Sequence, residues 1–96
     1  MNKTEHLLIC LMEECAEIQQ AAAKALRFGI TNGHPDSKTT NAEDIVKEYA
    51  DLKGVIHMLS DLEDTIFLEA VDLMANEKKE RVEKYMKYAE SKKLLE

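Results

Sequence analysis

The sequence predicts an all-α protein, a small bundle of three to four helices that forms a single domain over residues 1–96. Apolar residues recur at three- and four-residue spacing along most of the chain, and no strand pattern or repeat competes with them. Only three Gly and one Pro interrupt this periodicity, and the 45% hydrophobic and 33% charged content is typical of a soluble, helix-rich protein. A chain of 96 residues offers material for one core.

The first helix is expected from about Thr4 to Phe28, with Thr4 as its N-cap and Gly29 as its end. Its apolar positions share one face and are Leu7, Leu8, Leu11, Cys15, Ile18, Ala22 and Leu26. The segment that follows, GITNGHPDSKTTN, contains two of the three Gly residues and the only Pro, and it has no apolar period. It is therefore expected to be a loop.

The second helix is expected to begin at Thr40 or Asn41. Thr40 with Glu43 forms a capping-box pattern, and Asn41 with Asp44 offers nearly the same pattern one residue later. The predicted core face of this helix consists of Ile45, Tyr49, Leu52, Ile56 and Leu59.

A break is expected near Asp61, where Ser60 and Glu63 repeat the capping pattern. The chain either begins a new helix there or continues with a kink, because the next apolar positions keep helical spacing: Leu62, Ile66, Phe67, Ala70, Val71 and Met74. The charged segment NEKKERVEKYMKYAESKKLLE predicts the last helix, whose lysine-rich end suits a helix C-terminus. Its apolar face consists of Val82, Tyr85, Met86 and Ala89.

The formal net charge of −6 argues against binding to a nucleic-acid polymer, whereas a nucleotide that carries a divalent cation remains a possible ligand. The chain has no long apolar run and no signal-peptide pattern, so we expect no membrane association and a cytoplasmic location. Cys10 and Cys15 lie too far apart around a helix to bridge each other, which fits a reducing compartment, and both are interpreted as small buried hydrophobes.

Acidic residues lie close to the apolar faces of the first two predicted helices. In EECAE, Glu13 points away from the apolar face, Glu14 lies at its edge and Glu17 lies one step further round. In EYAD, Glu48 and Asp51 both point inward. Burial of unpaired carboxylates is costly. Basic residues could neutralise them, they could lie at the rim of the domain, or a divalent cation could gather them.

The spacing of these acids suits a metal site. Residues three apart share one face of a helix, so Glu14 with Glu17 and Glu48 with Asp51 each form a pair of oxygen ligands. Two facing helices would then supply four carboxylates. Oxygen ligands without His or thiolate suit Mg²⁺ or Mn²⁺, and Mg²⁺ is usually shared with substrate phosphates.

The ordered motifs EECAE (Glu13–Glu17) and EYAD (Glu48–Asp51) resemble the EExxE and ExxD motifs of the MazG-like all-α nucleoside triphosphate pyrophosphohydrolases. That superfamily also includes the dimeric dUTPases and phosphoribosyl-ATP pyrophosphatase. The similarity continues through AAAKALRFG, DLKGVI and KKERVEKYMKY. The resemblance implies that Glu14, Glu17, Glu48 and Asp51 bind Mg²⁺, and that Glu13 or Glu17 has a catalytic role in holding the attacking water.

The resemblance also implies that basic residues bind the substrate phosphates, and the candidates are Lys24, Arg27, Lys78 and Arg81. Lys24 follows Glu17 on nearly the same helix face, although it could equally form an ordinary surface ion pair; Arg27 projects further away. Lys78 and Arg81 fall within the apolar arc of the last helix, where long basic side chains can bury their stems. The chain departs from some relatives in its longer segment between the motifs and in its lack of Trp.

The implied activity is Mg²⁺-dependent hydrolysis of a (deoxy)nucleoside triphosphate to the monophosphate and pyrophosphate, as housekeeping of the nucleotide pool. The resemblance implies a homodimer or a dimer of dimers that completes the core of the bundle. Two alternatives remain open. One is a pyrophosphohydrolase of the same superfamily that acts on phosphoribosyl-ATP or another nucleotide, and the other is a catalytically inactive helical interaction module.

Overall fold

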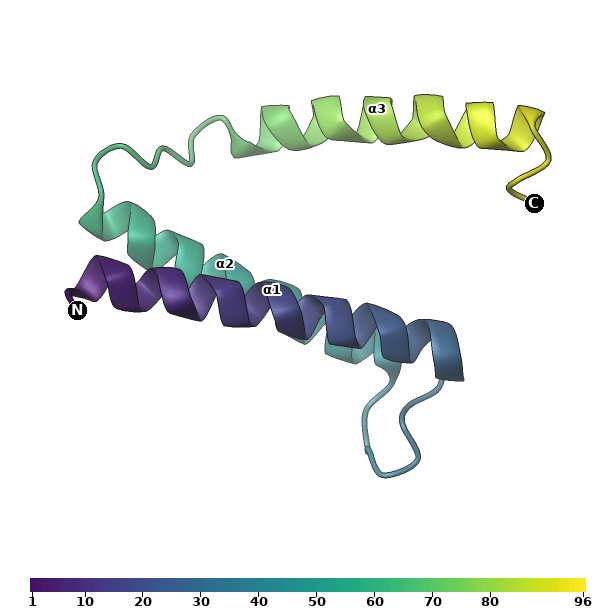
Figure 1. The fold of residues 1–96 in the computed structure, drawn as a ribbon, viewed down its shortest axis with the longest axis horizontal. Helices are drawn as coiled ribbons and strands as arrows, with labels where there is room; N and C mark the ends of the chain where they lie inside the picture. Colours follow the sequence, from purple (N-terminus) through teal and green to yellow (C-terminus); the bar gives the residue numbers. More distant parts are fainter. The chain divides into compact units, whose positions relative to one another are not determined.

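The computed structural model describes all 96 residues and contains three helices and no strand (Figure 1). The helices are α1 (Lys3–Phe28), α2 (Asn41–Leu62) and α3 (Val71–Ser91). The predicted all-α class is therefore confirmed. The chain divides into two compact units, Met1–Ile66 and Phe67–Glu96, which are described separately below. The single domain over residues 1–96 stays a prediction.

Helix α1 begins at a capping box formed by Asn2 and Glu5. The Asn2 side chain accepts a hydrogen bond from the Glu5 N–H at 2.8 Å, and the Glu5 carboxylate accepts one from the Asn2 N–H at 3.4 Å. The prediction of Thr4 as N-cap is wrong, because Thr4 lies inside the first turn and its hydroxyl donates to Glu63 Oε1 at 2.6 Å. Gly29 ends the helix as predicted, with a φ of 93° that favours glycine.

The loop from Gly29 to Thr40 is held to the end of α1 by Asn41, a residue that is 1% exposed. Its Nδ2 donates to the Gly29 carbonyl at 2.8 Å and to the Lys24 carbonyl at 3.3 Å. Its backbone N–H donates to the Asn32 carbonyl at 2.6 Å. The predicted loop is thus confirmed, and Asn41, the residue that follows it, is hydrogen-bonded to Gly29 at its start and to Asn32 within it.

Helix α2 has Thr40 as its N-cap, one of the two predicted positions, and the Thr40 hydroxyl accepts from the Glu43 N–H at 3.1 Å. The helix ends at Leu62, which confirms the predicted break near Asp61.

The expectation that the apolar positions from Leu62 to Ala70 continue a helix is wrong. The chain between α2 and α3 forms turns, with the Ile66 N–H bonded to the Glu63 carbonyl at 3.1 Å. The Ser60 hydroxyl does not cap a new helix, because it donates to the Ile66 carbonyl at 2.9 Å.

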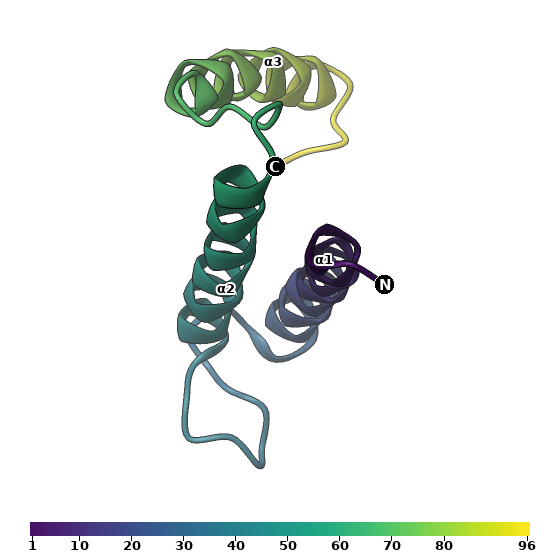
Figure 2. The same ribbon diagram turned by 90° about the vertical axis from the view of Figure 1, so that its left-hand side faces the viewer.

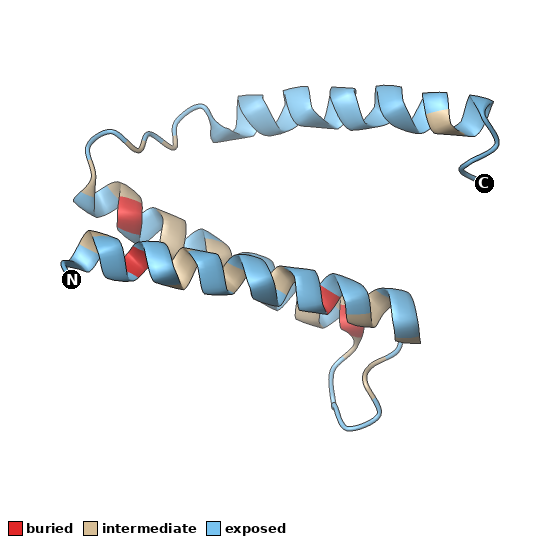
Figure 3. Ribbon diagram, in the orientation of Figure 1, coloured by how far each residue is buried: buried red, intermediate tan, exposed pale blue.

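The first unit is a pair of helices, α1 and α2, that pack against each other (Figures 1 and 2). The buried apolar residues are Leu7, Ala21 and Leu59, and Figure 3 shows the buried positions toward the two ends of this pair. Most predicted core positions of α2 are half-buried, but Tyr49 is 63% exposed, so its assignment to the core is wrong. Leu26 is likewise 89% exposed. Two helices bury only the narrow stripe along their contact, whereas the apolar arc of each helix is wider.

The two cysteines are free, in agreement with the prediction that they do not bridge each other. Cys10 is half-buried, but Cys15 is exposed. The interpretation of Cys15 as a buried hydrophobe is therefore wrong.

The second unit consists of α3 with the turns that flank it. Helix α3 has no buried residue, and Figure 3 shows it exposed along nearly its whole length. Val82, Tyr85 and Met86 of its predicted apolar face are 43%, 66% and 47% exposed. None of the three helices is both long and apolar enough to cross a membrane.

Candidate metal centre

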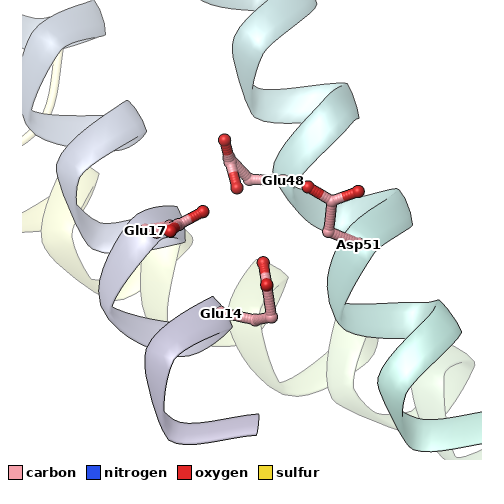
Figure 4. A group of neighbouring side chains, drawn as sticks. All are labelled: Glu14, Glu17, Glu48 and Asp51. Atoms are coloured by element: carbon pink, nitrogen blue, oxygen red, sulfur yellow. The ribbon is translucent and has the colours of Figure 1, made fainter. Parts of the chain in front are cut away.

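Four carboxylates from α1 and α2 gather at the middle of the helix pair and point toward one another (Figure 4). Glu14 and Glu17 extend from α1, and Glu48 and Asp51 extend from α2. Each residue offers one oxygen atom, and these oxygens lie within 4.8 Å of one another. The three-residue spacing on each helix thus brings the two predicted pairs together, and we call these four residues the acidic cluster.

Two oxygens of the acidic cluster are buried and lack any hydrogen-bond partner: Glu14 Oε2 and Glu48 Oε2. The Glu48 side chain as a whole is 16% exposed. Buried polar atoms in folded proteins are almost always paired, because an unpaired one has lost water without replacement. The unpartnered oxygens and the oxygen-only donor set fit a hard divalent cation such as Mg²⁺ or Mn²⁺.

The environment of Glu48 favours the protonated form of its carboxyl group. Hydrogen bonding to the Glu17 carboxyl, followed by burial, raises the pKa of Glu48 above its ordinary value of 4.5, although the Lys47 ammonium partly opposes the shift. Glu48 therefore retains a proton to higher pH than a solvated glutamate would. Metal binding in that pH range would have to displace this proton.

Lys47 is a member of the site that the motifs do not indicate. Its Nζ donates to Asp51 Oδ2 at 2.8 Å and lies 3.7 Å from Glu48 Oε1. The hydrogen bond and the charge of Asp51 raise the pKa of Lys47. The sequence left open that a basic residue neutralises the acids, and Lys47 does so for Glu48 and Asp51 on α2. Glu14 and Glu17 on α1 form no ion pair. The spacing of Lys47 and Asp51, four apart on one helix, is the sequence signal that could have identified this contact.

A hollow of about 300 Å³ adjoins the acidic cluster. It is lined by Glu17, Gln20, Ala21, Lys24, Asp44, Lys47 and Glu48, and we call it the lysine hollow. Lys24 is half-buried in its wall, so the structure places this predicted phosphate ligand beside two members of the cluster.

Two other predicted site residues of the first unit lie outside the acidic cluster and the lysine hollow. Glu13 is exposed on α1 and is not one of the four gathered acids. Arg27 is also exposed, and its guanidinium lies over the Phe28 ring at 5.3 Å from the ring centre. The roles of these two residues stay predictions.

Lys78 and Arg81 belong to the second unit, where both line a hollow of about 420 Å³ on α3 together with Val82, Tyr85 and Met86. Their proximity on one face of the helix agrees with the apolar arc deduced from the sequence. Their contact with substrate phosphates stays a prediction.

A further hollow, of about 520 Å³, lies where the start of α1 meets the end of α2. Its lining consists of Met1, Asn2, Lys3, His6, Leu7, Met58, Asp61 and Leu62. None of the four gathered acids contributes to it.

Comparison of the chain with protein-family models, with curated proteins and with solved structures gives no match. The assignment of a function therefore depends on the chemistry of the residues in the acidic cluster and the lysine hollow.

Proposed function

We propose that the protein is a Mg²⁺-dependent (deoxy)nucleoside triphosphate pyrophosphohydrolase of the MazG-like kind. The observation that most strongly supports this proposal is the convergence of Glu14, Glu17, Glu48 and Asp51, whose ligand oxygens lie within 4.8 Å of one another. Two of the four side chains carry a buried oxygen without a partner. An arrangement that served only to stabilise the fold would not place four like charges together, because their mutual repulsion destabilises the folded state.

The four carboxylates of the acidic cluster would hold Mg²⁺, with Mn²⁺ as an alternative. When bound, the ion would neutralise charge on the substrate phosphates and lower the pKa of a nearby water. The open, partly exposed side of the cluster, where Glu17 is exposed and the Asp51 side chain is 41% exposed, leaves access for phosphate oxygens.

The proposed reaction is attack by a water oxygen on the α-phosphorus. The new bond joins this oxygen to phosphorus, the bond from the α-phosphorus to its bridging oxygen breaks, and pyrophosphate leaves. Glu17 is the better placed of the two candidate catalytic carboxylates, because it borders both the acidic cluster and the lysine hollow, and it would accept the proton of the water. Glu13 is the alternative.

The lysine hollow would receive part of the triphosphate chain. Lys24 in its wall would donate hydrogen bonds to phosphate oxygens, as an ammonium does at many phosphate sites.

Further candidates for substrate contacts are Arg27, Lys78 and Arg81. The net charge of −6 supports a free nucleotide rather than a nucleic-acid polymer as substrate. Phosphoribosyl-ATP or another nucleotide is the alternative substrate.

A homodimer or dimer of dimers is part of the proposal. The chain buries only Leu7, Ala21 and Leu59 among its apolar residues, and α3 buries none. Such a small apolar core rarely stabilises a chain of this length, and a second copy would cover more of its apolar surface. Light scattering at micromolar protein concentration should give at least twice the chain mass; a strictly monomeric protein would contradict this part. The free cysteines fit a reducing compartment such as the cytoplasm.

A catalytically inactive interaction module is the second candidate. It is favoured by the apolar side chains left exposed on α3, which suit a protein partner, and by the ion pair of Lys47 with Asp51, which already satisfies part of the acidic cluster. The two candidates differ in their response to Mg²⁺, because a module without a metal site should melt at the same temperature with and without the ion.

The deciding experiment is a panel of common NTPs and dNTPs, together with phosphoribosyl-ATP, incubated with the protein and Mg²⁺. Pyrophosphate and orthophosphate should be measured separately, and the proposal expects pyrophosphate in equimolar amount with the nucleoside monophosphate. Glu48→Gln should abolish this product, whereas Asp64→Asn, an equal change of charge at an exposed residue outside the cluster, should leave it unchanged. Full turnover in Glu48→Gln would refute the site.

A further inference from the structure

Lys47 is the only basic residue that forms an ion pair with the acidic cluster. Its ammonium contacts Asp51 Oδ2 at 2.8 Å and lies 3.7 Å from Glu48 Oε1. We propose that Lys47 is a built-in counter-cation that competes with the divalent metal for Asp51 and Glu48, and thereby sets the metal concentration at which the site fills. This inference rests on the proposed metal site.

The contact geometry makes the two cations compete for the Asp51 carboxylate. A carboxylate oxygen that accepts a short hydrogen bond from an ammonium shares one of its lone pairs and part of its charge with that group, so it is a weaker metal ligand. A divalent ion at the same carboxylate would also be repelled by the ammonium charge. Metal binding therefore requires Lys47 to leave Asp51, or to remain at the cost of a weaker metal bond.

The Lys47 side chain can leave without disturbance of the fold. It is 66% exposed, and its backbone belongs to α2. It also lines the lysine hollow, together with Asp44 three residues earlier on the same helix and with Lys24 from α1. A displaced ammonium thus has another carboxylate on its own helix face, and it joins Lys24 on the side from which phosphate would approach.

The expected size of the effect follows from Coulomb's law. Removal of one positive charge at roughly 5 Å from a divalent cation, in water-like surroundings, corresponds to about a 15-fold lower Kd at low salt. Because Lys47 is largely exposed and can move aside, the measured change should be between about threefold and tenfold, and it should shrink as ionic strength rises.

The experiment is isothermal titration of the 96-residue chain with MgCl₂ and, separately, with MnCl₂, at low and at high KCl and without nucleotide. Lys47→Met removes the charge and keeps the length of the side chain, whereas Lys47→Arg keeps the charge. Lys53→Met is the matched control, because Lys53 is exposed on α2 and forms no ion pair. We expect tighter metal binding in Lys47→Met alone, with the gain reduced at high salt.

Unchanged or weaker metal binding in Lys47→Met, with normal binding in the wild type, would overturn this inference and leave the metal site intact. An equal gain in Lys53→Met would also overturn it, because the effect would then come from net charge. Absence of metal binding in the wild type and in every variant would overturn both the inference and the metal site. Loss of metal binding in Glu48→Gln, together with tighter metal binding in Lys47→Met, would support both the inference about Lys47 and the metal site.

Discussion

Replacement of Glu48 by glutamine should raise the stability of the metal-free protein and reduce its response to Mg²⁺. Glutamine has nearly the same shape as glutamate but no charge, so the substitution keeps the packing between α1 and α2. It removes the carboxylate that is 16% exposed and whose Oε2 is buried without a partner. Most substitutions of half-buried residues destabilise, which makes the expected sign informative.

The magnitude follows from the distances in the acidic cluster. Two like charges 4.8 Å apart repel by about 0.9 kcal/mol in water and by about 3.5 kcal/mol at an effective dielectric constant of 20. Glu17 is exposed and Lys47 offsets part of the repulsion on Glu48, so the lower figure is appropriate. A gain of about 1 kcal/mol is expected, which for a chain of this size raises Tm by about 4–8 °C.

The second part of the experiment measures the stabilisation by Mg²⁺, which should be smaller in Glu48→Gln than in the wild type. Mg²⁺ at about 100 times its Kd should stabilise the wild type by about 2.7 kcal/mol. Glu48→Gln removes one of the four carboxylate ligands, so the same Mg²⁺ concentration should give less than half of the wild-type rise in Tm. Far-UV circular dichroism melts in EDTA and in excess Mg²⁺ measure both effects, with Asp64→Asn as the charge-matched control.

A lower Tm of Glu48→Gln in EDTA would refute the reasoning, because it would show that the Glu48 charge stabilises the metal-free fold. An unchanged rise in Tm with Mg²⁺ would show that Glu48 is not a ligand. If Glu48→Gln and Asp64→Asn changed the Tm equally, the change would come from the net charge of the protein and not from the acidic cluster.

Two further predictions concern pH and the loop. Because hydrogen bonding to Glu17, followed by burial, raises the pKa of Glu48 above 4.5, its contribution to the metal-free fold is complete below pH 4.5 and is lost as pH rises through the raised pKa. The Tm of the wild type in EDTA should therefore fall relative to that of Glu48→Gln as pH increases through this window, and a constant difference would contradict the shift. Asn41→Ala should cost about 1–3 kcal/mol in urea unfolding, because it leaves the Gly29 and Lys24 carbonyls without their donor. A loss below about 0.5 kcal/mol would show that water replaces the amide.

The sequence by itself determined the bounds of α1 and α2 closely, because helix ends are set by local interactions. Gly29 supplies the positive φ that ends α1, and Thr40 caps α2 through the Glu43 N–H three residues on. The two carboxylate pairs were also predictable, because residues three apart share a helix face whatever surrounds the helix.

The tertiary structure decided which groups these local elements meet. Thr4 bonds to Glu63, which lies 59 residues away, and no local pattern predicts a contact at that separation. Tyr49 is exposed because one partner helix covers only part of the apolar arc of α2. Likewise, a glutamate on an apolar arc can be solvated, paired or metal-bound. The packing of α1 on α2 leaves oxygens of Glu14 and Glu48 buried and unpartnered, since desolvation depends on the neighbouring helix rather than on the residue itself.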